Sequence, residues 1–122
     1  MKEVVFDIET NGFLDKLDRV HVVSWQDNTM SEPTSGYDLE CISSLYDADM
    51  IIGHNILRFD LDAVAKVYGI RPSEKTILVD TLILAWYLDY ERTEKGLNYG
   101  LEAYGITFGV PKPKIVDWDG LS

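Results

Sequence analysis

The stretch Val4–Leu14, which reads VVFDIETNGFL, decides the fold because a strand suited to burial carries two acids within it. Its first residues are apolar and β-branched, which is typical of a central strand. Asp7 and Glu9 stand two positions apart, so their side chains project from the same face of such a strand. The apolar residues that alternate with them face the other way. Two neighbouring carboxylates on one face of a strand require something to neutralise them.

Two explanations account for this pair of acids. Carboxylates on one face repel each other and hold protons more tightly unless a cation lies between them. No Lys or Arg occurs between Lys2 and Lys16, and carboxylate oxygens are ligands that Mg²⁺ and Mn²⁺ favour. A bound metal ion is therefore one explanation. The other, which an isolated Asp-x-Glu pattern leaves open, is that both acids lie on the solvated face of an edge strand.

Length and composition limit the classes of protein to consider. A chain of 122 residues has the size of one compact domain, with 21 acidic and 11 basic residues and a formal charge of −10. This balance argues against a nucleic-acid coat protein, which normally presents a basic face. The single cysteine, Cys41, forms no internal disulfide, and no apolar run approaches the length of a membrane span. We therefore expect a cytoplasmic protein that is not embedded in a membrane.

Residue patterns predict alternating strands and helices after an initial strand meander. We expect strands at 3–8, 19–26, 29–34, 50–53 and 76–79, and helices at 38–47, 60–68, 80–90 and 97–106. Asp38 is expected to cap the first helix and Gly69 to end the second. The helix at 80–90 is apolar almost all round, so we expect it to be buried, with Asp80 as its cap. Residues 91–96 are expected to form a loop. This order predicts an α/β fold, a mixed five-stranded sheet flanked by helices.

Aromatic and other large side chains are assigned to the core by the same patterns. These residues are Trp25, Trp86, Tyr87 and Leu88.

A second stretch, Gly53–Val64 (GHNILRFDLDAV), joins the end of a short strand to the following helix. Ligands collect at the carboxyl ends of strands in open α/β sheets. Asp60 stands at the start of the helix, where an acid binds a metal or caps the free N–H groups. His54 and Asn55 are ordinary turn residues or hydrogen-bond donors to a substrate. The stretch alone does not decide between these alternatives.

Four ordered motifs resemble a known family. FDIET (6–10), followed about 45 residues later by HNILRFD (54–60), resembles the first two motifs of the DEDD, or DnaQ-like, superfamily of 3′–5′ exonucleases. VDTLILAWYL (79–88) and GLEAYGITFG (100–109) further resemble the exonuclease domain of family-A DNA polymerases from short-tailed lytic phages. The resemblance extends from about residue 3 to residue 119. It implies a ribonuclease-H-like fold and, for a phage protein, the cytoplasm of a bacterial host.

The resemblance also implies an activity and its residues. It implies hydrolysis of the 3′-terminal phosphodiester of single-stranded DNA with two Mg²⁺ or Mn²⁺ ions, and it gives Asp7, Glu9 and Asp60 the roles of metal ligands and catalytic acids. Substrate contacts are implied at Thr10, Phe13, Leu14, His54, Asn55 and Phe59. Arg58 is a further candidate for a phosphate contact, with a solvated surface role as the alternative.

One motif of this family has no counterpart in the chain. The fourth acid of the superfamily belongs to a Tyr-x3-Asp or His-x3-Asp motif on a final helix, and no such spacing follows the second motif here. We therefore expect residues 1–122 to be a single incomplete exonuclease domain without the final helix, weak or inactive alone.

Three explanations of this missing motif remain open. A second chain or a polymerase domain supplies the helix. The protein is instead an inactive, exonuclease-like module that binds a partner protein or DNA. In the third explanation, Asp117 or Asp119 folds back to replace the missing acid.

Overall fold

The computed structural model describes residues 1–110, and the chain divides after Asp80 into two compact units. The first unit, Met1–Asp80, contains a five-stranded sheet and the helices packed on it. The second unit begins at Thr81, and its described part is helical. No helix between residues 1 and 110 is long and apolar enough to cross a bilayer.

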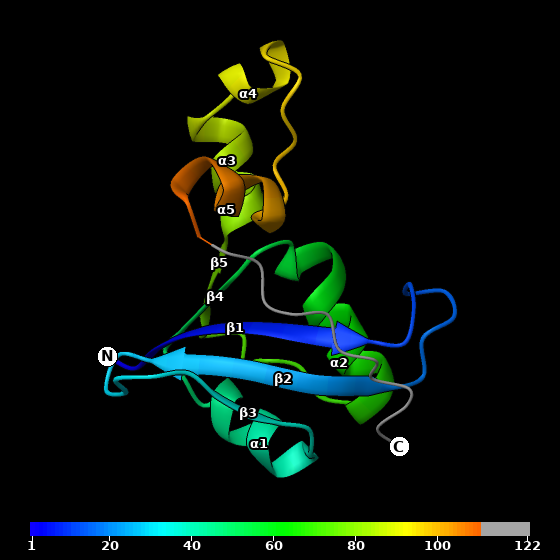
Figure 1. Ribbon diagram of the computed structural model, residues 1–122. Coiled ribbons are helices and arrows are strands. Elements are labelled where there is room, and N and C mark those ends of the chain that lie inside the picture. Colours follow the sequence, from blue (N-terminus) through cyan, green and yellow to red (C-terminus); the bar gives the residue numbers. More distant parts are fainter. Residues whose placement is uncertain (111–122) are drawn as a thin grey trace. The chain divides into compact units, whose positions relative to one another are not determined.

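The sheet of the first unit is mixed, as the sequence predicts. Its strands are β1 (Glu3–Thr10), β2 (Val20–Asp27), β3 (Thr34–Gly36), β4 (Met50–Gly53) and β5 (Ile77–Asp80). They lie in the order β3-β2-β1-β4-β5, with β1 at the centre (Figure 1). β2 is antiparallel to β1 and β3, whereas β4 is parallel to β1 and β5. The predicted α/β fold class is therefore confirmed.

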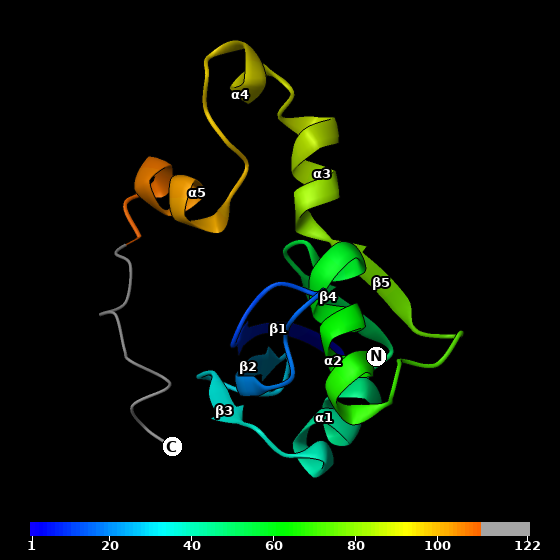
Figure 2. The ribbon, with the colours of Figure 1, turned by 90° about the vertical axis from the view of Figure 1, so that its right-hand side faces the viewer.

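One face of β1 forms the core of this unit. Val4, Phe6 and Ile8 are at most 8% exposed, and their cluster includes residues of two helices, α1 (Leu39–Tyr46) and α2 (Leu61–Tyr68). Both helices thus pack on the same side of the sheet, and they lie close together in Figure 2. Val5, Asp7 and Glu9, which alternate with these residues, are exposed. The expected separation of an apolar face from an acidic face is confirmed.

The expected ends of both helices are confirmed as well. The Asp38 carboxylate accepts the N–H of Cys41 at 2.8 Å and caps α1. α2 ends at Gly69, whose φ of 75° lies in the left-handed region that glycine adopts without strain.

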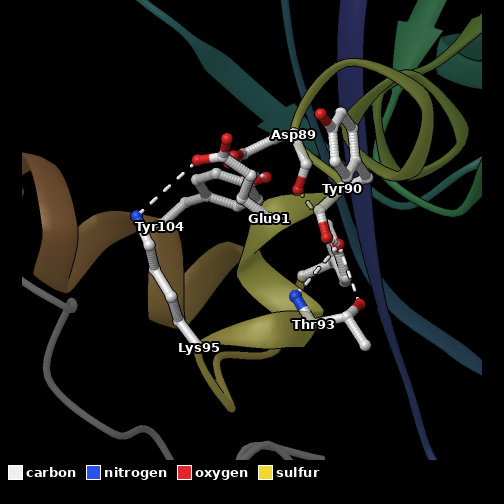
Figure 3. Close-up of polar contacts among 7 residues, drawn as sticks. Asp89, Tyr90, Glu91, Thr93, Lys95 and Tyr104 are labelled. Atoms are coloured by element: carbon white, nitrogen blue, oxygen red, sulfur yellow. Dashed lines mark hydrogen bonds and ion pairs between the residues drawn. The ribbon is translucent and has the colours of Figure 1, made fainter.

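The second unit contains α3 (Thr81–Leu88), α4 (Glu91–Glu94) and α5 (Leu101–Phe108). Polar contacts connect α5 to the chain between α3 and α4. The Tyr104 hydroxyl donates to the Asp89 carboxylate at 3.0 Å, and the Arg92 guanidinium lies 4.0 Å from the centre of the Tyr104 ring. Figure 3 shows Asp89 and Tyr104 together with Thr93 and the weaker ion pair of Lys95 with Glu91. Arg92 is itself buried, at 5% exposure.

Four expected elements differ from the structure. The third strand begins after Pro33 rather than around it, because proline offers no N–H to a neighbouring strand. Residues 91–94 form a helical turn instead of a loop, and the burial of Arg92 against Tyr104 explains a turn that the charged sequence does not indicate. The last helix starts at Leu101, after Gly100, and not at 97. The fourth difference concerns α3.

The expectation that the helix at 80–90 is buried is wrong. α3 spans Thr81–Leu88 and contains no buried residue. Trp86, Tyr87 and Leu88, all expected in the core, are 39%, 84% and 75% exposed. A unit of three short helices offers too little surface to enclose one of them on all sides. Trp25, by contrast, packs against the core of the first unit as expected.

Candidate active site

The carboxyl half of β1 extends beyond the strand next to it. β4 pairs with β1 only from Glu3 to Val5, after which the chain leaves the sheet at Gly53. A Cβ atom at Gly53 would lie 3.0 Å from the carbonyl oxygen of Phe6 and 2.3 Å from Cγ2 of Ile56. A glycine at this position therefore lets the chain turn directly alongside the half of β1 that does not pair with β4.

The segment that follows is a wide π-helical turn, η1 (Ile56–Asp60), which leads directly into α2. It begins after Asn55, whose φ of 63° is the only positive φ of a non-glycine residue between residues 1 and 110. Asparagine tolerates this left-handed conformation better than most residues. Ile56 is completely buried and fixes the start of the turn in the core. Such turns often occur at functional sites, yet the sequence gives no direct signal for one.

Asp80, the last residue of β5, bonds to the start of this turn. Its two carboxylate oxygens accept the backbone N–H groups of Asn55 and Leu57, at 2.9 and 3.0 Å. The side chain is 5% exposed. The sequence predicts Asp80 only as a cap for the following helix. It does not predict these two hydrogen bonds, which join residues 23 and 25 positions apart. An acid at the end of a parallel strand was the available signal.

Asp60 is the last residue of η1 and is 5% exposed. Its carboxylate does not cap α2, so the capping alternative for this residue is excluded. Its Oδ2 atom is buried and accepts no hydrogen bond from the described residues. Asp62, the other acid at this helix start, instead forms a surface ion pair with Arg71 at 2.9 Å. Asp60 is therefore a buried acid whose second oxygen is available to a ligand.

The electrostatics of Asp60 connect it to Asp7. Burial, followed by the negative charge of Asp7, raises the pKa of Asp60 to about 8, and the charge of Asp80 adds to this. Loss of hydration next to neighbouring protein atoms also raises the pKa of Asp7, although the residue as a whole is exposed, while the backbone N–H of Ile8 and the charge of His54 lower it. The N–H of Ile8 likewise lowers the pKa of Asp60. The structure thus brings together Asp7, Asp60 and His54 beside the half of β1 that does not pair with β4.

Two neighbouring acids and a buried, unbonded oxygen suit a divalent cation, which would relieve their repulsion. No group of three His, Cys, Asp or Glu side chains among residues 1–110 is arranged to hold a metal ion, however. Glu9 is exposed on the same face of β1 as Asp7. Asp7 and Asp60 therefore fit such an ion, while the complete set of Asp7, Glu9 and Asp60 stays a prediction.

The residues after β1 that were expected to contact substrate differ in exposure. The Thr10 hydroxyl donates to the carbonyl oxygen of Gly12 at 2.8 Å, which fixes the start of the loop. Phe13 is 85% exposed, whereas Leu14 packs against the hydrophobic core. Lys66 of α2 donates to the Leu14 carbonyl oxygen at 2.7 Å and holds the loop on the first unit. Of the two apolar candidates, Phe13 presents the more accessible surface.

The candidate substrate-binding residues of the second stretch, Gly53–Val64, also lie in different environments. His54 lies close enough to Asp7 to affect its pKa, and Asn55 forms the left-handed turn. Phe59 is partly buried against the core, and Arg58 is exposed. Their roles in substrate binding stay predictions. Asp117 and Asp119 lie outside the described residues.

The first unit has an α/β fold of the ribonuclease-H-like class. Three features define it: the strand order, the parallel pairing of β1 with β4, and the helices on one face of the sheet. No protein-family model and no curated protein sequence matches the chain. Two solved structures of NrnC from Brucella melitensis, one with bound Mg²⁺, superpose on 95% of the chain with a TM-score of 0.67, at 21% and 23% sequence identity. These likenesses show the fold that ribonuclease-H-like exonucleases share.

The chain spans only 57–58% of the length of NrnC. A family B DNA polymerase from the archaeon Pyrobaculum calidifontis aligns with 64% of this chain and 13% of its own, at 16% identity. Its TM-score of 0.44 is too low to bear on the fold or the site.

Proposed function

We propose that this chain is a metal-dependent nuclease domain of the DEDD type, which removes nucleotides from the 3′ end of single-stranded DNA. The observation that carries the proposal is the buried, unbonded oxygen of Asp60 beside the charge of Asp7. The four sequence motifs and the ribonuclease-H-like fold support it. The kinship with family-A phage polymerases rests on the sequence motifs alone and is part of the proposal.

The residues have distinct roles in this proposal. Asp7, Glu9 and Asp60 would hold two Mg²⁺ or Mn²⁺ ions, which would supply an activated water and charge stabilisation for the leaving 3′-oxygen. Phe13, with its exposed ring, would contact the terminal base or sugar. His54 would orient a phosphate oxygen beside Asp7. Bound cations would also cancel the negative charge that repels DNA from an acidic chain.

The proposed partners are the 3′ end of single-stranded DNA and a second chain or polymerase domain that supplies a helix with the third motif. The proposed setting is the cytoplasm, that of a bacterial host if the chain is phage-encoded.

A second candidate function is an inactive, exonuclease-like module that binds a partner protein or DNA. One observation favours it: no three metal-binding side chains converge among residues 1–110. In such a module the acids of β1 would be dispensable for partner binding.

Thermal unfolding with and without Mn²⁺ tests the metal site directly. An ion that binds only the folded state raises its stability by about 1.4 kcal/mol at ten times the dissociation constant, so millimolar Mn²⁺ should raise Tm by several degrees. Asp7→Asn and Asp60→Asn should abolish this rise. Asp62→Asn is the matched control, because it removes an acid two residues away that pairs with Arg71 at the surface. An unchanged Tm of the unmodified chain up to 10 mM Mn²⁺ would contradict the proposal.

Activity is measured on single-stranded oligonucleotides labelled at the 5′ end, with DNA and RNA in parallel. We expect slow shortening from the 3′ end of DNA that requires Mn²⁺ or Mg²⁺ and stops with EDTA and in Asp60→Asn. Faster shortening of RNA would reassign the substrate. If Asp7→Ala combined with Glu9→Ala leaves oligonucleotide binding intact and no variant cleaves, the binding module is the correct function.

A further inference from the structure

The structure contains one buried acid to which the proposed chemistry gives no part. Asp80 is 5% exposed, and it lies at the carboxyl end of β5, next to the turn that leads to Asp60. A buried carboxylate is retained only where strong hydrogen bonds compensate its loss of hydration. Each of its two oxygens accepts a hydrogen bond from one short segment: Oδ1 from the backbone N–H of Asn55 and Oδ2 from that of Leu57.

These two donors are the N–H groups that a helical turn leaves unsatisfied at its start. Asn55 precedes η1 and Leu57 is its second residue, so Asp80, at the end of the neighbouring parallel strand β5, accepts hydrogen bonds from both N–H groups. An anion at this position also interacts favourably with the aligned peptide dipoles of the turn. The Asn55 side chain makes no such cap. Asp80 therefore performs from a distance the capping that the local sequence lacks.

The hydrogen bonds to Asp80 also help to hold the unusual backbone conformation of Asn55. Its left-handed conformation is less favourable for asparagine than for glycine, and the π-helical turn after it is a rare form. Such geometry persists only where surrounding contacts hold it in place. Those contacts include the buried Ile56 side chain and the two bonds to Asp80.

We propose that Asp80 is a positioning residue for Asp60: by clamping the N–H groups of Asn55 and Leu57, it fixes the turn that holds the Asp60 carboxylate beside Asp7. Asp60 stands at the far end of the same five-residue turn, and α2, which begins at Leu61, fixes that end. A turn held at both ends keeps its last side chain in one place. The proposal rests on the proposed metal site, because the consequence of misplacing Asp60 is weaker metal binding.

Amide hydrogen exchange tests the clamp itself without reference to any metal. Asp80→Asn keeps the shape of the side chain but replaces one accepting oxygen with an NH₂ group that faces an N–H. We expect the amides of Asn55 and Leu57 to exchange at least about tenfold faster than in the unmodified chain. Amides of the remote α1 should be unaffected.

Mn²⁺ affinity, measured by calorimetry on the full chain, tests the consequence for the site. Supporting residues around a metal typically contribute about 10- to 100-fold, so Asp80→Asn should weaken Mn²⁺ binding by at least about tenfold. Asp80→Glu keeps the charge but lengthens the side chain, and it should weaken binding too. Asp38→Ala is the control, because it also removes a carboxylate that accepts a backbone N–H, at α1. It should lower Tm and leave Mn²⁺ affinity unchanged.

Each result decides the proposal. If Asn55 and Leu57 exchange at the unmodified rate in Asp80→Asn, Asp80 is not a clamp. If Asp80→Glu binds Mn²⁺ as the unmodified chain does while Asp80→Asn does not, the charge of Asp80 acts through space and positioning is refuted. If Asp80→Asn does not fold, Asp80→Glu carries both measurements. Absence of Mn²⁺ binding by the unmodified chain would refute the proposed function, and the exchange rates would still decide whether Asp80 clamps the turn.

Discussion

Replacing Asp60 with asparagine should stabilise the metal-free protein at alkaline pH, although it removes a proposed ligand. The pKa of Asp60 is raised from 3.8 to about 8 in the folded protein. Between these values the folded state keeps a proton that the unfolded chain has released, so the free energy of unfolding falls as the pH rises through this window. The asparagine side chain of the variant has no such proton to lose and should show no such fall.

The magnitude follows from the same values. At about 1.4 kcal/mol per pKa unit, a rise from 3.8 to about 8 corresponds to about 6 kcal/mol at pH 9. Water that reaches the ionised carboxylate reduces this penalty, so we expect a gain of about 2–5 kcal/mol for Asp60→Asn. For a chain of this size, each kcal/mol shifts Tm by about 3–5 °C. The variant should therefore unfold at least about 6 °C higher than the unmodified chain at pH 9.

The assay is thermal unfolding followed by circular dichroism in EDTA, at pH 4.5 and pH 9. The two proteins should differ by at most about 1 kcal/mol at pH 4.5, because this pH lies less than one unit above the ordinary pKa of 3.8. Asp62→Asn is the control, because an exposed ion pair contributes at most about 1 kcal/mol and its loss should change Tm only slightly at either pH. With millimolar Mn²⁺ in place of EDTA, the difference at pH 9 should become smaller, because the ion stabilises only the unmodified chain. An equal or lower Tm for Asp60→Asn at pH 9 would refute this account of the buried acid.

Two further predictions concern the segments beside the site. Gly53→Ala should lower the free energy of unfolding by about 1–3 kcal/mol in chemical denaturation, because the new Cβ would overlap Ile56 and approach the Phe6 carbonyl oxygen; an unchanged midpoint would show that the chain shifts freely there. Asn11→Ala should increase proteolytic cleavage between residues 12 and 18, because the Asn11 amide bonds Asp18 twice, at 2.6 and 3.1 Å. Cleavage at the unmodified rate would show that the loop is held by other contacts.

Much of the first unit could be predicted from local patterns. The alternation in β1 gives its buried and exposed faces, and Asp38 and Gly69 mark helix ends through their own backbone preferences. These signals depend on neighbours in the sequence and need no knowledge of the tertiary structure. The same patterns failed for α3, because uniform apolarity predicts burial only if enough other structure surrounds the helix.

The candidate site, like the fold, could be predicted from the sequence only in part. The sequence by itself determined the identity of the acids, since the spacing of Asp7 and Glu9 places both on one face and the motifs single out Asp60. Only the tertiary structure decided that Asp60 is buried next to the charge of Asp7, and that Asp80 bonds to the start of the turn that leads to Asp60. Burial and long-range hydrogen bonds arise when segments distant in the chain meet. No local pattern contains that information. The sequence determines that a carboxylate is present at a position, and the fold determines its pKa and what it binds.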